Sequence, residues 1–497
     1  MFNLLNVFFA FVMFAILLLL GRFVKQKVRL FQTLYLPESI IAGVIALLAG
    51  SGVLGAIAVS WGASPDSYWA GGIFPETMRT VWSQSPGVFI NIVFAALFLG
   101  EHIPNPKDIW RKTAPQVAFG QTLAWGQYTL GILLVMLVLT PVFGVNPIAG
   151  ALIEIAFEGG HGTAAGMSET LTQLNFPEGG DLAIGLATVG IVSGILFGTL
   201  LAHWGRTKGY IQTRVKSVST GDAQFQETAP TESSRVLARR RQLMDNLLID
   251  PLSLNLGFTG LAVVLGWLIL QLLTVIESLT WGRGGLELVG AVPLFPMALI
   301  GGIIIQLVMK RLDLDCLIIR RLQERIAGVA LDIVVVTALA SINLTVIGAN
   351  IGVFLSLAIM GIIWNVLAFI YLAPRIIPVY WFERGIGDMG QSMGVTATGI
   401  LLIRMVDADN STGAFESFAY KQLFFEPIVG GGLFTAAAPA LIVQFGSVSV
   451  LLLTTVLLAF WLIFGMTNCQ RTKQKLAEEQ ITAEARTPVM NTPPDLR

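Results

Sequence analysis

Charged residues and cysteine are scarce in this chain of 497 residues. Only 12% of its residues are Asp, Glu, Lys or Arg, against about 25% in an average soluble domain. The 31 basic and 31 acidic residues cancel to a formal net charge of +0, which leaves no basic excess for binding the phosphate backbone of a nucleic acid. Two cysteines, Cys316 and Cys469, are too few for a disulfide framework or a CxxC metal site.

Hydrophobic residues and glycine are abundant instead. Hydrophobic residues make up 54% of the chain, and 52 residues are glycine. A soluble globule cannot bury so much apolar surface, whereas helices in a bilayer use glycine to approach one another closely or to break. The composition therefore predicts an all-α polytopic membrane protein.

The apolar runs predict about 11 transmembrane helices, since a span needs about 20 mostly apolar residues. A polar linker at 203–250 divides them into two sets. Two further segments, about 148–178 and about 376–406, mix apolar residues with Gly, Thr and charge, and we expect them to be re-entrant hairpin loops. The predicted spans are 4–20, 39–59, 86–99, 116–143 and 181–202 before the linker, and 252–276, 292–309, 326–343, 349–372, 424–445 and 448–466 after it.

The distribution of Lys and Arg predicts the orientation. With the N-terminus outside, 26 of the 31 basic residues fall in inner loops or the tail, and three others lie around the second re-entrant segment. Only Arg79 and Arg283 fall outside. The positive-inside rule then predicts an outer N-terminus and a cytoplasmic C-terminus. The first apolar run precedes its basic cluster, so we interpret it as a span and not as a cleavable signal.

Two pairs of similar runs predict an inverted repeat. Residues 37–45 align with 296–304, and 157–162 align with 382–387. Because an odd number of spans precedes the linker, the second half enters the membrane from the opposite side, as in many secondary transporters. Chance similarity of glycine-rich stretches is the alternative. The predicted organisation is a first half at 1–202, the cytoplasmic linker at 203–250, a second half at 251–447, an extra span at 448–466 and a cytoplasmic tail at 467–497.

Glycine and threonine in the re-entrant segments indicate a binding site. Gly159, Gly160 and Gly162 permit positive φ, and Thr163 would lie near the start of the following half-helix. The run 394–399 is the second counterpart, again glycine with hydroxyls. The amino ends of half-helices favour a carboxylate, and freed carbonyls with Thr hydroxyls suit Na⁺. Glycine used only for helix packing is the competing interpretation.

Ionisable residues in and beside these segments leave alternatives open. His161 is a proton relay or pH sensor, or an imidazole bound to a loop carbonyl. Glu158 and Asp388 are functional intramembrane carboxylates, or lie near the interface at the hairpin entrances. Arg404 clamps a substrate carboxylate, or snorkels to the cytoplasmic interface.

Three further runs are distinctive: FEGGHGTAAG at 157–166, LPESIIAG at 36–43 and GVTATG at 394–399. With these runs the chain resembles the bacterial sodium/glutamate symporter family. The resemblance implies two five-span halves whose re-entrant loops form the transport site, with a scaffold and a mobile core that moves like an elevator. The signature residues implied are Gly159, Gly160, His161, Gly162 and Thr163 in the first loop and Gly394, Thr396 and Thr398 in the second.

The expected function is sodium-coupled import of L-glutamate across the bacterial cytoplasmic membrane. The expected partners are L-glutamate, Na⁺ and the lipid bilayer, with a homodimer as the assembly and no cofactor besides Na⁺ as coupling ion. Ala397 and Gly399 depart from the family pattern, so a sodium- or proton-coupled transporter or exchanger of aspartate, citrate or a dicarboxylate is the alternative. A scaffold or receptor has no need for broken membrane segments, and no catalytic or phosphate-binding motif indicates an enzyme. The candidate Na⁺ ligands are Thr163, Thr396, Thr398 and Asp388.

Overall fold

The computed structural model describes residues 3–33, 36–64, 67–101, 106–211, 239–240, 243, 249–284 and 288–486. Within these residues the regular structure is helical, and the one β-bridge joins Gly50 to Gly72. Most of the predicted linker at 203–250 lies outside the described residues. Seven of the described helical stretches are long and apolar enough to cross a membrane, so the protein is a polytopic membrane protein. They are Leu4–Lys27, Thr113–Phe143, Glu178–Thr207, Pro251–Leu279, Leu294–Arg311, Ile351–Tyr371 and Leu433–Glu478.

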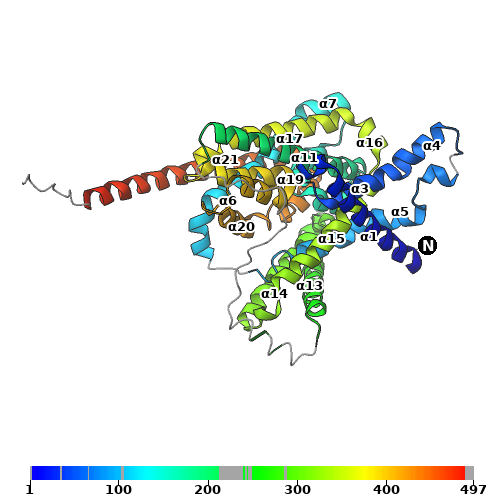
Figure 1. Cartoon of the computed structure of the whole chain (residues 1–497), viewed down its shortest axis with the longest axis horizontal. Coiled ribbons are helices and arrows are strands. Elements are labelled where there is room, and N and C mark those ends of the chain that lie inside the picture. Colours follow the sequence, from blue (N-terminus) through cyan, green and yellow to red (C-terminus); the bar gives the residue numbers. More distant parts are fainter. Residues whose placement is uncertain are drawn as a thin grey trace, which may run out of the picture.

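The helices form two groups, which Figure 1 shows side by side. In the first group, α5 packs along α15, and α14 packs on α5 and α13. In the second, α6 packs on α17, α20 and α21, while α11 packs on α19. The first group comprises α1 (Leu4–Lys27), α3 (Glu38–Ala49), α5 (Glu76–Ala96), α13 (Pro251–Leu279), α14 (Leu294–Arg311) and α15 (Arg320–Ser341). The second comprises α6 (Pro106–Leu134), α8 (Leu152–Phe157), α9 (Gly160–Gly166), α10 (Ser168–Gln173), α11 (Glu178–Thr207), α17 (Ile351–Tyr371), α19 (Trp381–Val406), α20 (Ala414–Phe425) and α21 (Leu433–Arg486).

A glycine stripe explains the close packing of α11 on α19. A Cβ added at Gly190 would lie 2.2 Å from the Met393 carbonyl oxygen, and one at Gly198 would lie 2.4 Å from the Leu402 side chain. Gly194, between them in the stripe, also faces Met393. Small residues spaced four apart let two membrane helices approach closely. The stripe therefore positions the second predicted re-entrant segment.

The structure has seven candidate spans among the described residues, fewer than the 11 predicted. The runs at 86–99 and 326–343 lie in α5 and α15, which are not among the seven, and the last two predicted spans fall in the one stretch Leu433–Glu478.

Two further runs differ in their course. The run at 39–59 is not one straight helix, because α3 ends at Ala49 and is followed by the π-turn Ser51–Gly55 and the short α4 (Ala56–Ser60). The span predicted to begin at 424 begins instead at Leu433, after a non-helical segment at 426–432. Gly430 and Gly431 in this segment have φ of 73° and 103°. Glycine adopts such positive φ values at low cost, and they do not occur in a regular right-handed helix.

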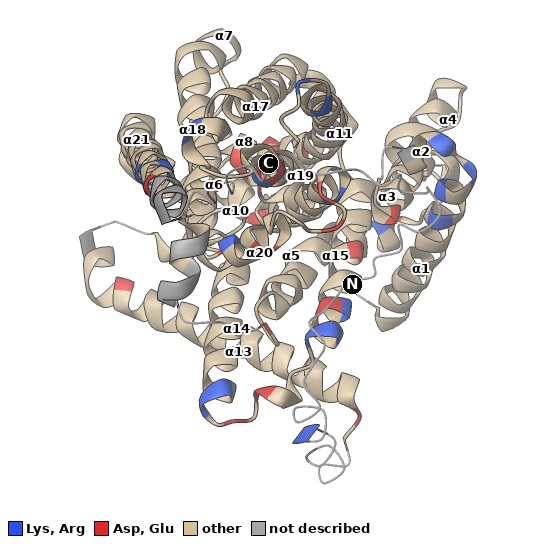
Figure 2. Cartoon of the chain, turned by 60° about the vertical axis from the view of Figure 1, so that its left-hand side comes forward, with Lys and Arg blue, Asp and Glu red and all other residues tan. Residues whose placement is uncertain are grey.

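Charged residues are concentrated at a few places. Figure 2 shows basic residues together at the end of α1 and around α2 (Arg29–Thr33), while most of the ribbon carries no charge. Lys25 and Lys27 lie in the last turn of α1. The inner helices instead bury single carboxylates, including Glu154, Glu158 and Asp388. Because an intramembrane charge is costly and usually functional, these buried carboxylates locate the candidate site.

Candidate functional site

Two helix breaks meet inside the second group of helices. The first break separates α8 from α9, and Gly160 there has a φ of 66°. The second interrupts α19 at Gly394 and Val395, where Val395 has a φ of 61° and a ψ of 174°. A Cβ added at Gly160 would lie 2.2 Å from Val395 Cγ1. The two breaks therefore touch each other, although 234 residues separate Gly160 from Gly394 in the sequence.

The three glycines of the first run have different roles. All three glycines permit a positive φ, but only Gly160 adopts one. A Cβ at Gly159 would lie 2.6 Å from both the Ile155 oxygen and Thr163 Cβ, and one at Gly162 would lie 2.8 Å from Ile90 Cδ1. These two glycines are needed for close packing, on the Thr163 side chain and on α5 respectively.

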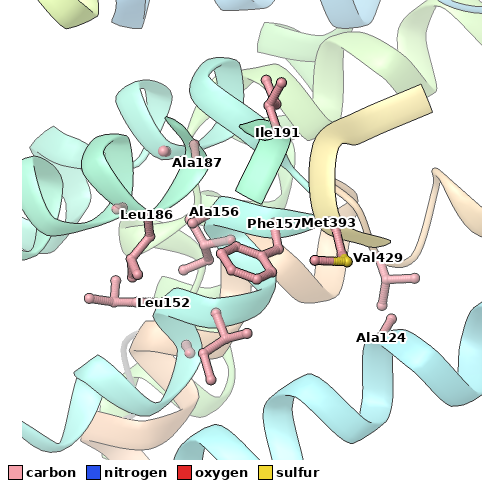
Figure 3. Close-up of a cluster of buried hydrophobic side chains, with 14 of the residues drawn as sticks. Ala124, Leu152, Ala156, Phe157, Leu186, Ala187, Ile191, Met393 and Val429 are labelled. Carbon is pink, nitrogen blue, oxygen red and sulfur yellow. The ribbon is translucent and has the colours of Figure 1, made fainter. Parts of the chain in front are cut away.

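Apolar side chains surround the breaks. Figure 3 shows Phe157 and Met393 close together, with Ile191 of α11 and Val429 nearby. Phe157 and Met393 are completely buried, and the Phe157 ring packs where Gly190 and Gly361 lack side chains. This shell keeps the unpaired backbone at the breaks away from lipid, as a membrane protein requires.

Glu154 ties the first broken helix to the glycine segment at 426–432. It accepts hydrogen bonds from the Tyr128 hydroxyl at 2.5 Å, the Gly430 amide at 2.8 Å and the Thr435 hydroxyl at 2.8 Å. Its side chain is fully buried. Glu154 is not among the site residues predicted from the sequence. The local signal that could have shown it is a carboxylate one helical turn before Glu158 in an otherwise apolar run.

Glu158 ties the two breaks together. One of its oxygens, Oε1, accepts a hydrogen bond from the Ser392 hydroxyl. Among the described residues, neither its buried Oε2 nor the buried Thr163 Oγ1 has a hydrogen-bond partner. The Ser392 carbonyl near the second break accepts from Gln127 Nε2 at 2.7 Å and from Asn365 Nδ2 at 3.0 Å. The backbone freed by the second break is thus partly satisfied, while two oxygens at the first break are left available to a ligand.

The two threonines after the second break face different partners. Thr396 donates to Glu426 Oε1 at 3.2 Å, and Thr398 donates to the Gly394 carbonyl at 2.6 Å. Glu426 precedes the glycine segment and is mostly buried. The run EPIVGGG at 426–432 is the signal that could have identified this third element of the site.

Asp388 lies in a buried ion pair. Lys421 Nζ of α20 donates to Asp388 Oδ1 at 2.9 Å and to Gln391 Oε1 at 2.8 Å. Both charged side chains are 0% exposed. The structure therefore places Asp388 beside Lys421, which is not among the site residues predicted from the sequence. Among the described residues, Asp388 shares no hydrogen bond with Thr163 or Thr398.

His161 and Arg404 are engaged elsewhere. His161 Nε2 shares a hydrogen bond with the Thr188 hydroxyl of α11 at 2.9 Å, so its partner here is a helix side chain and not the loop carbonyl that we weighed above. The Arg404 guanidinium lies over the Phe415 ring, 6.0 Å from its centroid.

A tight loop ends the second arm of α19. Asp407 accepts hydrogen bonds from the backbone amides of Ser411 and Thr412 at 2.8 and 2.9 Å. Burial raises the pKa of the Asp407 carboxyl, but the hydrogen bonds from Thr412 and Ser411 outweigh burial and hold the pKa below its ordinary value. Asp407 is therefore ionised at neutral pH and fixes the end of the arm.

Known proteins match the region that contains both breaks. The sodium/glutamate symporter family model matches residues 116–404. A sodium/glutamate symporter from Haemophilus influenzae is 24% identical over 245 residues, which are 49% of this chain and 54% of that relative. The chain thus matches about half the length of the relative. Lys421, Glu426 and the glycine segment at 426–432 lie beyond the residues that the family model matches.

Proposed function

Because the chain belongs to the sodium/glutamate symporter family, a family of transporters and not of enzymes, we propose that it imports L-glutamate with Na⁺ across the bacterial cytoplasmic membrane. The contact between the two helix breaks at Gly160 and Val395 is the observation that carries this proposal. Irregular backbone persists at membrane depth only where it is buried in protein or lines a cavity. Secondary transporters bind substrate and coupling ions at such breaks.

The proposed substrate site comprises the residues on both sides of the breaks. Thr163 lies in the first turn of α9, and Thr396 begins the second arm of α19. Free amides and partial positive charge at the start of a half-helix favour an anion, so a glutamate carboxylate is the ligand that the two ends suit. The proposed residues are Gly159, Gly160, His161, Gly162, Thr163, Gly394, Thr396 and Thr398.

For Na⁺ we propose a site at the first break. Thr163 Oγ1 and Glu158 Oε2 are buried oxygens without hydrogen-bond partners among the described residues. Na⁺ is a hard cation that prefers oxygen ligands, and the freed carbonyls of the break add further ligands. Thr398 is a weaker candidate than Thr163, because its hydroxyl already donates to the Gly394 carbonyl. Asp388 also has a buried oxygen, Oδ2, without a hydrogen-bond partner among the described residues, but its charge is already balanced by the ammonium of Lys421 at Oδ1.

The packing of the helices supports an inverted repeat with halves at 1–202 and 251–447. The pair α1 and α3 corresponds to α13 and α14, and the contact of α3 with α15 corresponds to that of α14 with α5. The helices α5 and α15 pack on each other, as elements beside a pseudo-twofold axis do. However, the aligned runs differ in place, because Phe157 adjoins the first break whereas Phe382 begins α19, well before the second. The breaks themselves are the better structural equivalents.

An elevator movement is the mechanism we propose for alternating access. The first break faces the other helix group through small residues, since Gly162 and Gly166 of α9 lie against Ile90 of α5. Gly431 of the glycine segment likewise lies against Phe94 of α5. At this contact the group with both breaks has glycines and few protruding side chains, so it presents little steric resistance to sliding along α5. We propose that the group with both breaks slides along α5 and α15.

Reconstituted vesicles test the transport activity. An inward Na⁺ gradient should drive uptake of labelled glutamate, with a sigmoidal dependence on Na⁺. An inside-negative potential set with valinomycin should accelerate uptake if two or more Na⁺ accompany the anion, because each net charge contributes about 2.3 kcal/mol per 100 mV. Uptake of citrate, malate or aspartate in preference to glutamate would contradict the assignment of glutamate as the substrate. Uptake that ignores Na⁺ but follows a proton gradient would remove the sodium coupling.

Impermeant cysteine labelling tests the proposed orientation. In a background without Cys316 and Cys469, a cysteine at Ser64 should react from outside, and a cysteine at Thr472 should react only from inside. Reaction at Thr472 from outside, or no reaction at Ser64, would contradict an outer N-terminus and a cytoplasmic C-terminus.

A further inference from the structure

The ion pair of α20 with α19 contains the one Lys or Arg that is fully buried within the described part of the chain. This residue is Lys421, and its side chain is 0% exposed. Its ammonium contacts Asp388 Oδ1 at 2.9 Å and Gln391 Oε1 at 2.8 Å. The ammonium also lies 4.1 Å from the centroid of the Phe425 ring and 5.1 Å from that of Phe418.

The surroundings of this ammonium resemble those of a bound monovalent cation. A carboxylate oxygen, an amide oxygen and two aromatic ring faces are groups that stabilise a desolvated cation. On the opposite side, α6 has a glycine, and a Cβ at Gly120 would lie 3.0 Å from Lys421 Nζ. Three helices, α6, α19 and α20, thus surround the position of the ammonium with polar and aromatic groups, and the end of the Lys421 side chain occupies the space between them.

Lys421 lies next to the candidate transport site, where its charge affects the carboxylates that would bind the coupling ions. Hydrogen bonds link Lys421 to both sides of the site: Gln391 accepts from Lys421 Nζ at 2.8 Å and donates to Glu426 Oε1 at 3.4 Å. The next residue, Ser392, donates its hydroxyl to Glu158 Oε1. Glu158 provides one of the proposed Na⁺ ligands, and Glu426 binds Thr396 at the second break. The lysine therefore supplies positive charge to the same group of carboxylates that the coupling ions would neutralise.

We propose that Lys421 is a built-in cation that occupies a monovalent-cation site beside Asp388 and so sets how many exchangeable cations the transport core takes up. The proposal rests on the proposed function for its effect on coupling, but the cation site itself does not. A lysine that only stabilised the fold would not change the number of Na⁺ taken up per transport cycle when its side chain is removed.

Two substitutions at one position test whether the space that Lys421 vacates binds a cation. Lys421→Ala removes the charge and leaves space, whereas Lys421→Met removes the charge and fills the space. In the purified full-length protein, both variants should lose thermal stability. Propylammonium chloride, whose atoms match those that Lys421→Ala removes, should restore the melting temperature of Lys421→Ala but not that of Lys421→Met. Choline chloride at equal concentration is the salt control, and no selective recovery would overturn the proposal.

The dependence of uptake on Na⁺ tests the consequence for coupling. In Lys421→Ala, Na⁺ itself can enter the vacated site, so the Hill coefficient for Na⁺ should rise by up to about one relative to the native protein. Lys473→Ala, which removes an exposed lysine, should keep the native curve. A native curve in Lys421→Ala would contradict the proposal. If the native protein shows no Na⁺-driven uptake, the proposed function fails, while the stability measurement still decides whether the cation site exists.

Asp388 provides a second route if Lys421→Ala does not accumulate. Asp388→Asn keeps the ammonium but removes its carboxylate partner, so a fixed positive charge is left beside Glu158 and Glu426. The KM for Na⁺ should then rise, and the double variant Asp388→Asn with Lys421→Met, which is neutral at both positions, should bring it back toward the native value. An unchanged KM in Asp388→Asn would overturn the proposal.

Discussion

Both helix breaks contain a residue with a positive φ, but the residue type differs between them. At the first, the left-handed conformation falls on Gly160, which adopts a φ of 66° without steric conflict. At the second, it falls on Val395, a β-branched residue with a φ of 61°. Such a conformation costs a non-glycine residue on the order of 1–3 kcal/mol. The positive φ of Val395 at the second break must therefore be stabilised by the surrounding structure. The positive φ at the first break needs no such support, because Gly160 adopts it at low cost.

The contact between the breaks explains why the strain falls on Val395. The Val395 methyl occupies the place that a Cβ on Gly160 would need, 2.2 Å from Cγ1. The two positions are therefore complementary, because the side chain missing from one break is supplied by the other. Strained backbone of this kind is typical of functional sites, where the surrounding structure enforces it.

The largest effect is expected for Gly160→Ala. The new Cβ would meet Val395 Cγ1, which adds overpacking of roughly 1–3 kcal/mol to a left-handed penalty of about 1–2 kcal/mol. We expect no Na⁺-driven glutamate uptake, with normal insertion measured by membrane fractionation. Gly144→Ala is a matched control, because Gly144 has the same φ of 66° but nothing within 4 Å of its added Cβ. Normal uptake kinetics in Gly160→Ala would place the transport site elsewhere.

Thr163→Val should have the next largest effect, because it should weaken the binding of Na⁺ at the first break. The substitution keeps the shape but removes a hydroxyl oxygen that has no other partner among the described residues. An oxygen bound to a charged group contributes about 1.5–3 kcal/mol, so the KM for Na⁺ should rise about tenfold or more. Thr172→Val, at an exposed hydroxyl that bonds to the Ser168 carbonyl, should leave uptake unchanged. An unaltered KM in Thr163→Val would remove this threonine from the ion site.

Val395→Gly tests the complementarity of the breaks. It relieves the left-handed strain at the second break but adds flexibility to the unfolded chain, which offsets about 0.5–1 kcal/mol of the gain. We expect the unfolding free energy to rise by about 0–2.5 kcal/mol from these two contributions, with retained uptake. The double variant Gly160→Ala with Val395→Gly should recover part of the uptake lost in Gly160→Ala. No recovery would mean that the backbone conformation of Gly160, and not its contact with Val395, limits transport.

The smallest effect is expected where the second arm ends. Asp407→Ala removes the acceptor for the Ser411 and Thr412 amides and should lower stability by about 1 kcal/mol at pH 7. Because the folded-state pKa is below its ordinary value, this stabilisation is present above the unfolded value of about 3.9. It should disappear as the pH falls through the folded pKa. Thermal melts of both proteins at neutral and acidic pH measure the difference, and a gap that persists in acid would contradict a role for the ionised carboxyl.

The amino-acid sequence was sufficient to predict the membrane class and to single out the two glycine- and threonine-containing runs in which the structure interrupts its helices. A long apolar run folds as a helix in a bilayer whatever its neighbours are, because every backbone group must be paired within the segment. Glycine next to threonine inside such a run is a local signal that the helix is interrupted. In the structure the helices are interrupted at Gly160 and at Gly394 with Val395. These features depend on residues that are adjacent in the chain.

Only the tertiary structure decided which side chains the breaks meet. Glu154 bonds to the Gly430 amide, Glu158 to Ser392, and Asp388 to Lys421, and each pair joins residues of different helices. A lone carboxylate in an apolar run shows that a partner is needed, but hydropathy and spacing do not say which distant segment supplies it. That choice follows from glycine-mediated packing, such as that of α11 on α19, because only close approach of helices brings buried charges within hydrogen-bonding distance.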